Sequence, residues 1–192
     1  MLGSLDAYDA VCRNLCSRTP AIVVSVDYGL APEYTFPVAL VDSITAIKWA
    51  YKNAENLGAD QSRFALVGDS AGGGLVAGAT QSLASDPTIQ IGFQVLVYPV
   101  TDWSNFTSAS YEKFGGGGYL LTREMMQWFG DCYFKTKSDR KDPRASPLLA
   151  KEFNNLPPAL IITAGYDPLY EEGKNYAIAL KNAGVDVKHK NY

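Results

Sequence analysis

The chain has 192 residues, of which 47% are hydrophobic and 19% are charged, and this predicts a single globular domain over residues 1–192. The formal net charge of -3 comes from 17 basic and 20 acidic side chains that form no long runs. This balance excludes the basic surface that nucleic acid or an anionic membrane would require. A small molecule is therefore the partner that the composition favours.

The sequence predicts a soluble protein of the cytoplasm. No apolar stretch reaches the length of about 18 residues that a membrane span needs, and Met1 is not followed by a secretory leader pattern. The count of 3 cysteines is odd and low for a disulfide-dependent chain. Cys12 and Cys16 stand one helical turn apart, and we interpret them as buried or half-buried free thiols. The His or Cys partners that a metal site at these cysteines would need are absent, so neither a metal nor a cofactor is expected.

The chain alternates between apolar runs and helical patterns. Residues 21–28 are rich in β-branched side chains and predict a first strand, buried on both faces. A helix is expected at 37–57, where Pro37 suits the helix start and apolar residues recur at the spacing of one face. Further strands are expected at 63–69, 91–99, 158–166 and 185–192, and further helices at 71–84, 123–135 and 171–183.

This alternation predicts the α/β class, with a mostly parallel sheet and helices on both faces. Gly184 fits the end of the last helix because glycine adopts the left-handed conformation easily. Residues 101–121 interrupt the pattern, and we expect them to form an excursion over the carboxyl ends of the strands, where open α/β sheets bind ligands. The glycines at 115–118 are interpreted as a turn, since no Lys-Ser/Thr pair follows them as in a phosphate-binding loop.

Residues 68–72 read Gly-Asp-Ser-Ala-Gly between a predicted strand and a predicted helix. A serine in such a turn projects its hydroxyl above the sheet edge, and the flanking glycines let the backbone pass closely. Ser70 is therefore the candidate nucleophile. The backbone N–H of Ala71, at the helix start, is the candidate oxyanion donor. The alternative, a turn without function, is disfavoured by the strand before the motif and the small-residue helix after it.

Asp167 is the candidate catalytic acid. A serine hydroxyl needs a base to become nucleophilic, normally a histidine oriented by a carboxylate. In α/β hydrolases the chain order is serine, acid, histidine, and the acid follows a later strand. Asp167 follows the predicted strand at 158–166. The alternative is that it only ends that strand or caps the next helix.

Taken together, residues 68–73 (GDSAGG) and the triplet Asp167-Pro168-Leu169 resemble the motifs of the hormone-sensitive-lipase group of α/β hydrolases. Residues 27–33, 98–99 and 146–148 agree with this resemblance, which covers nearly the whole chain. Gly29 stands where relatives usually have arginine, and Tyr34 where many have histidine, which puts the local salt bridges of that turn in doubt. The resemblance implies hydrolysis of carboxylic esters, short-chain esters above all, through an acyl-enzyme on Ser70. It alone implies a homodimer formed through the last strand.

The resemblance also implies two segments outside this chain, which we therefore expect to be a partial domain truncated at both ends. Relatives carry an upstream His-Gly-Gly-Gly motif that leads into a segment similar to Leu2-Gly3-Ser4 and supplies further oxyanion donors. Their catalytic histidine lies roughly 30 residues beyond the acid, which falls past Tyr192. The bare fragment is expected to be inactive, and an unpaired strand edge near residue 21 is expected to make it poorly soluble.

His189 is the only histidine in the sequence. It lies inside the predicted last strand between Lys188 and Lys190, in an alternating pattern typical of a solvated face, so we interpret it as an ordinary surface residue rather than the base. The lack of a base leaves a second hypothesis open. The protein could be a small-molecule binder that kept the hydrolase pocket and lost the chemistry, as the plant gibberellin receptors of this group did by replacing the histidine.

Overall fold

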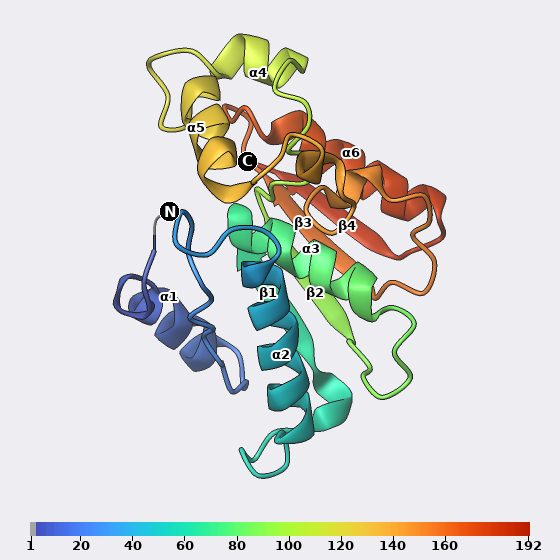
Figure 1. Cartoon of the computed structure of the whole chain (residues 1–192). Coiled ribbons are helices and arrows are strands. Elements are labelled where there is room, and N and C mark those ends of the chain that lie inside the picture. The colour runs from blue at the N-terminus through green and yellow to red at the C-terminus, as the bar shows by residue number, and fades with distance from the viewer. Residues whose placement is uncertain (1–2) are drawn as a thin grey trace.

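The computed structural model describes residues 3–192 and is built on a four-stranded parallel sheet in the order β1-β2-β3-β4 (Figure 1). The strands are β1 (Ala65–Asp69), β2 (Phe93–Val97), β3 (Ala159–Thr163) and β4 (Val187–Asn191). Each lies inside one of the segments for which a strand was predicted, so the α/β class and the parallel sheet are confirmed. Because all the strands are parallel, their carboxyl ends share one edge of the sheet.

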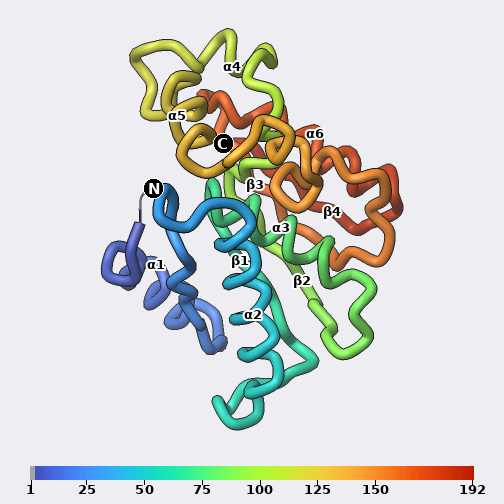
Figure 2. Tube along the Cα trace, viewed as in Figure 1, coloured from blue at the N-terminus to red at the C-terminus, as the bar shows by residue number. Residues whose placement is uncertain are grey.

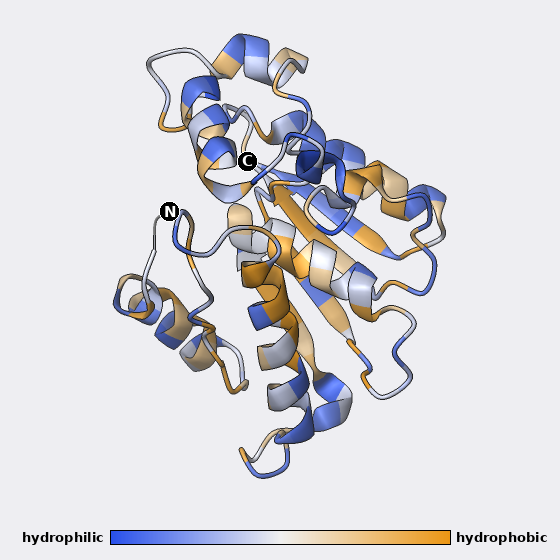
Figure 3. Ribbon diagram, in the orientation of Figure 1, coloured by the Kyte–Doolittle hydropathy of each residue, from blue (hydrophilic) through white to orange (hydrophobic). Residues whose placement is uncertain are grey.

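Helices α2 (Val38–Lys52), α3 (Ala71–Leu83) and α6 (Tyr170–Asn182) cover one face of the sheet. The strand register aligns one row of buried residues under them: Leu66, Gln94, Ala159 and Val187. On the opposite face Val67 remains 52% exposed. Within residues 3–192, helices therefore cover one face of the sheet more completely than the other. Figure 3 shows apolar character along β3 and hydrophilic residues over most of β4.

Residues 21–28 do not form the predicted first strand. The segment runs between α1 and α2 without a strand partner (Figure 2). Ile22 and Val24 remain about half exposed. An open hollow separates residues 24–27 from Trp49 of α2. An apolar run becomes a strand only when a neighbour pairs with its N–H and C=O groups. β1 pairs with β2 on one side only, so residues 21–28 obtain no such neighbour in the described part of the chain.

Helix α1 (Leu5–Arg18) lies at the margin and has no buried residue. The Ser4 side chain caps it by accepting a hydrogen bond from the Ala7 N–H at 3.2 Å. Cys12 is half-buried as predicted, whereas the expectation was wrong for Cys16, which is exposed. The reason is that this helix packs too lightly to cover both thiols. Of the Leu2-Gly3-Ser4 segment, Leu2 lies outside the described residues.

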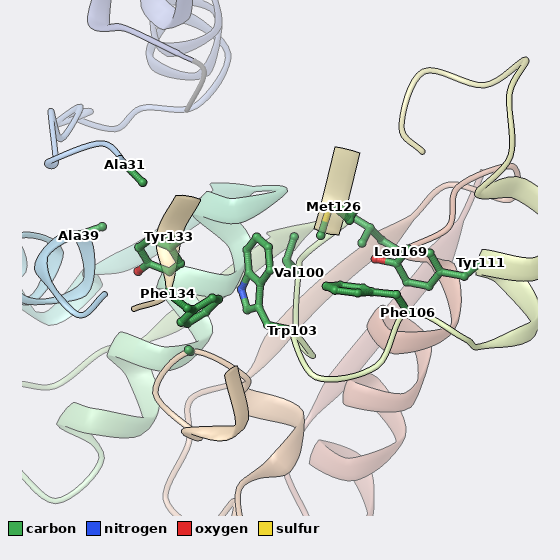
Figure 4. Close-up of a cluster of buried hydrophobic side chains, with 11 residues drawn as sticks. Ala31, Ala39, Val100, Trp103, Phe106, Tyr111, Met126, Tyr133, Phe134 and Leu169 are labelled. Atoms are coloured by element: carbon green, nitrogen blue, oxygen red, sulfur yellow. The ribbon is translucent and has the colours of Figure 1, made fainter. Parts of the chain in front are cut away.

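The predicted excursion at 101–121 does pass over the carboxyl edge of the sheet (Figure 1). It contains the short helix α4 (Ala109–Phe114) and leads into α5 (Arg123–Tyr133), within the range 123–135 where a helix was predicted. An aromatic cluster holds it together: Figure 4 shows Trp103 beside Phe134 and Phe106 close to Tyr111. The glycines at 115–118 form the turn that follows α4, as expected. Short 3-10 helices at Gln61–Arg63, Asp139–Lys141 and Pro147–Leu149 complete the connections.

Candidate active site

Ser70 occupies a strained turn between β1 and α3. Its backbone angles are φ 53° and ψ -120°, a region that costs a residue with a side chain on the order of 1–3 kcal/mol. The Ser70 N–H donates to the Val97 carbonyl at 2.9 Å, and the Ser70 carbonyl accepts from the Val100 N–H at 3.1 Å and from the Gly74 N–H at 3.2 Å. Hydrogen bonds from the end of β2 and from α3 therefore hold the serine in this conformation.

The glycines around Ser70 are required by close backbone packing. A Cβ on Gly68 would overlap the carbonyl group of Gly72, and one on Gly74 would overlap the Val100 carbonyl oxygen. Gly72 differs, since a Cβ there would meet nothing within 4 Å. The sharp turn thus depends on Gly68 and Gly74 for space.

Ala71 is the first residue of α3. Backbone N–H groups in the first turn of a helix have no acceptor within the helix, and the helix dipole adds positive potential there. The Ala71 N–H thus lies at the start of α3, directly after Ser70 in the chain, and has no acceptor within the helix.

Asp167 lies on the same edge of the sheet, four residues beyond the end of β3. Only β2 separates β1 from β3, which corresponds to about 10 Å across the sheet between the two turns. The Asp167 side chain is half-buried, and its Oδ1 accepts the Leu169 N–H at 2.9 Å. Burial raises the pKa of Asp167, while the hydrogen bond from Leu169 opposes that rise. Both predicted site residues are therefore at one edge.

Tyr98 stands on this edge between the two turns, directly after β2. Its φ of 36° is unusual for a residue with a side chain, and its N–H donates to the Ile162 carbonyl at 2.6 Å. Burial raises the pKa of the Tyr98 hydroxyl, and the negative charges of Asp69 and Asp167 raise it further. In the sequence, Tyr98 stood out only as part of a family motif. Its place at the end of a predicted strand could have indicated that it lies at the edge that carries the site.

Ser110 of α4 fastens the turn that carries Asp167. Its hydroxyl donates to the Pro168 carbonyl at 2.6 Å, and its N–H donates to Glu171 Oε2 at 2.9 Å. The side chain is buried. The excursion therefore contacts the acid turn directly, which the sequence did not reveal.

Glu172 is buried in the first turn of α6. Its Oε1 accepts the Thr101 N–H at 2.7 Å and the Asp102 N–H at 3.2 Å. Burial raises the pKa of Glu172 well above its usual value, while these two N–H groups lower it. Sequence reasoning missed this residue too. The available signal was its spacing of four from Tyr176, which places it on the apolar face of α6.

His189 lies in β4 as predicted, but its assignment to a solvated face was wrong. The register pairs it with Ile161, on the face that α6 covers, and its Nε2 lies 2.9 Å from Thr163 Oγ1. Burial lowers its pKa, and the nearby charges of Lys181 and Lys174 lower it further. The alternating lysines around His189 predicted the strand correctly, but they predicted the wrong face of the sheet for His189. The His189 imidazole is thus occupied by a contact within the sheet.

Asp69, next to Ser70, receives a hydrogen bond from α1. The Tyr8 hydroxyl donates to Asp69 Oδ2 at 2.9 Å, and burial together with this carboxylate raises the pKa of Tyr8 to about 12. The first helix is therefore attached to the residue beside the candidate nucleophile.

Over residues 3–192, no group of three or more His, Cys, Asp and Glu side chains is arranged to hold a metal ion. Within the same range, no helix has the length and apolar character needed to cross a bilayer.

Comparison with known proteins identifies close relatives. A family profile described as alpha/beta hydrolase fold matches residues 1–192. The chain is 41% identical over 189 residues to an ethyl acetate hydrolase of Pseudomonas putida, covering 98% of this chain and 59% of that protein. It is 40% identical over 185 residues to an arylesterase of Saccharolobus solfataricus, covering 96% of this chain and 60% of that protein.

The fold also matches solved structures. EstE1, a thermostable carboxylesterase cloned from a metagenomic library, superposes with a TM-score of 0.96 at 42% identity, covering 100% of this chain and 65% of that one. These findings agree with the resemblance to the hormone-sensitive-lipase group. The chain spans 59% and 60% of the lengths of the two curated relatives above.

Proposed function

The chain belongs to the alpha/beta hydrolase fold family, and on that premise we propose that it carries the nucleophile and the acid of a carboxylic ester hydrolase. The observation that supports this most strongly is Ser70 held at φ 53° on the edge that also carries Asp167. Strained backbone of this kind persists only where surrounding contacts hold it, and it is common at reactive sites. The name of the Pseudomonas relative, ethyl acetate hydrolase, supports short-chain esters as the substrate class.

In the proposed reaction the Ser70 Oγ attacks the ester carbonyl carbon as a base removes the hydroxyl proton. The negative charge that develops on the carbonyl oxygen is stabilised by the Ala71 N–H at the start of α3. The bond to the alcohol oxygen then breaks, the alcohol leaves with the proton, and an acyl-enzyme remains on Ser70. Water, activated by the same base, hydrolyses it and releases the carboxylic acid.

Asp167 has the role of holding and stabilising the protonated base. We propose that this base is a histidine other than His189, whose Nε2 already contacts Thr163. The family resemblance puts such a histidine roughly 30 residues after Asp167.

The test uses the full-length protein with p-nitrophenyl esters whose acyl chains range from acetyl to palmitoyl. We expect the largest kcat/KM for the short acyl chains, and we expect a fluorophosphonate probe to label Ser70 and no other residue. The control is Ser70→Ala, which should abolish both signals. A folded protein that neither hydrolyses any of these esters nor reacts with the probe would overturn the proposal.

The binding-protein hypothesis makes the opposite prediction for the same experiment. A receptor-like relative that lacks the base should bind a small ligand, measured by calorimetry, without labelling of Ser70 at an enzymatic rate. Rapid labelling of Ser70 excludes it.

A further inference from the structure

A hydrogen-bonded route runs from the serine turn to α6 through one buried side chain. The Ser70 carbonyl accepts the Val100 N–H at 3.1 Å, and the next residue, Thr101, donates its N–H to Glu172 Oε1 at 2.7 Å. Glu172 lies five residues after Asp167, in the first turn of the helix that follows the acid. The two candidate catalytic turns, on different strands, are therefore joined through the Glu172 carboxyl group.

The surroundings of Glu172 make this link demanding. The residue is 6% exposed, and none of the ion pairs found in residues 3–192 includes it. A buried carboxyl group without a cation depends on its hydrogen-bond donors, here the N–H groups of Thr101 and Asp102. Moving α6 away from this loop would leave the carboxyl oxygen and both N–H groups unpaired in the interior. Such a contact fixes position more strictly than apolar packing, which is not directional.

The neighbouring packing leaves little room for adjustment. Pro99, just before this loop, lies between α3 and α6: a Cβ on Gly73 would come within 2.9 Å of it, and a Cβ on Gly173 within 3.5 Å. Both helices therefore approach the loop closely, and Glu172 supplies the polar contact that sets their register.

We propose that Glu172 is a positioning residue, whose carboxyl group ties the Asp167 turn to the loop that holds Ser70 and so sets the geometry between the acid and the nucleophile. This role rests on the proposed ester hydrolysis. A displacement of about 1 Å between reacting groups can lower a rate by about 100-fold. Loss of the tie should therefore reduce turnover far more than substrate binding.

The experiment compares four variants of the full-length protein with p-nitrophenyl acetate, below the melting temperature of the least stable variant. Glu172→Leu keeps a similar volume without an acceptor, Glu172→Asp shortens the reach, and Glu172→Gln keeps a carbonyl oxygen for the Thr101 N–H. Tyr176→Phe is the matched control, because it removes a buried hydrogen bond of the same helix, to Gln81 at 3.2 Å, one turn further on.

We expect Glu172→Leu to lower kcat by about 10- to 100-fold with KM changed by less than about threefold. Glu172→Asp should show a smaller loss of kcat, and Glu172→Gln should recover most of the activity. Tyr176→Phe should stay within about twofold of the wild type. If Glu172→Leu does not fold, the kcat of Glu172→Asp provides the test instead. Unchanged kcat in the folded Glu172 variants, or an equal loss in Tyr176→Phe, would overturn the proposal.

Amide hydrogen exchange separates this role from the proposed function. Exchange should accelerate at the amides of residues 100–102 and 169–170 in the Glu172 variants and remain slow there in Tyr176→Phe. If the wild type hydrolyses no ester, the proposed function fails, and the exchange data alone judge the tie. Unchanged exchange at both turns then refutes it, and faster exchange at both supports it.

Discussion

The serine turn and the acid turn lie on the same edge of the sheet but are built in different ways. The conformation of Ser70 depends on residues next to it in the sequence, above all on the space left by Gly68 and Gly74. Hydrogen bonds from the end of β2 then hold the strained backbone. The motif therefore provides the space for this turn, and contacts with the end of β2 hold its conformation.

The acid turn depends on distant parts of the chain. Ser110, 58 residues before Pro168, fastens its carbonyl, and Glu172 connects the following helix to Thr101, 71 residues earlier. The comparison teaches that the serine turn combines a local glycine motif with hydrogen bonds from one neighbouring strand, whereas the acid turn is positioned by side chains from distant segments. Substitutions in the two turns should accordingly differ in kind.

The largest effect is expected at Ser70 itself. Ser70→Ala removes the nucleophile and should lower kcat by about 10⁶, measured with p-nitrophenyl acetate on the full-length protein. Residual hydrolysis within 100-fold of the wild type would show that another group performs the attack.

Ser70→Gly is the matching test of backbone strain. Glycine tolerates positive φ, so this variant should be as inactive as Ser70→Ala but melt at a higher temperature than it does. Equal melting temperatures for the two variants would contradict the idea that the turn stores strain.

The next largest effect is expected at Asp167. Asp167→Asn keeps an oxygen for the Leu169 N–H but cannot stabilise a protonated base, so kcat should fall by about 10⁴. A loss of less than tenfold would remove Asp167 from the proposed mechanism.

Asp167→Asn should lose activity but gain stability. Because the pKa of Asp167 is raised by burial, its contribution to stability is fully present below the unfolded value of 3.8 and is lost as the pH rises through the folded pKa. Asp167→Asn should therefore gain stability relative to the wild type between pH 4 and pH 7 in urea titrations. A constant difference across that range would argue against the raised pKa.

A smaller effect, on folding alone, is expected from the glycines. Gly68→Ala forces a Cβ against the Gly72 carbonyl group and should reduce the free energy of unfolding by about 1–3 kcal/mol or more. Gly72→Ala is the control, because the space there is open and alanine favours a helix by up to about 1 kcal/mol. Equal destabilisation by both would refute the packing argument.

The smallest effect is expected at the clasp on the acid turn. Ser110→Ala leaves the Pro168 carbonyl without its donor and should cost about 1–2 kcal/mol of unfolding free energy, with a loss of kcat of only a few fold. Ser108→Ala is its control, since the Ser108 hydroxyl is 3.0 Å from that of Ser110 and has no other hydrogen-bond partner among residues 3–192. A greater loss of unfolding free energy in Ser108→Ala than in Ser110→Ala would contradict the role of Ser110 in holding the Pro168 carbonyl.

The sequence predicted those parts of the molecule that adjacent residues determine. The segments 63–69, 91–99, 158–166 and 185–192 each contain a strand, although the observed strands are shorter because pairing ends where the neighbouring strand ends. Ser70 and Asp167 were found for the same reason, since both follow a recognisable run.

The features that the sequence did not predict depend on partners. Residues 21–28 have the composition of a buried strand but no neighbour to pair with in residues 3–192. The face of β4 that carries His189 is set by register with β3, which composition does not encode. Glu172 and Ser110 act through contacts across the fold. The spacing of Glu172 from Tyr176 places it on the apolar face of α6, but the local sequence does not show what either residue contacts.

The aromatic cluster of the excursion also provides an optical probe. Trp103 is 5% exposed within it, whereas Trp49 and Trp128 are 55% and 56% exposed. Iodide should therefore quench the two outer indoles and leave the fluorescence of Trp103, whose emission maximum reports the polarity around the excursion. Loosening of this region could then be followed separately from melting of the sheet, in real time and without any attached dye.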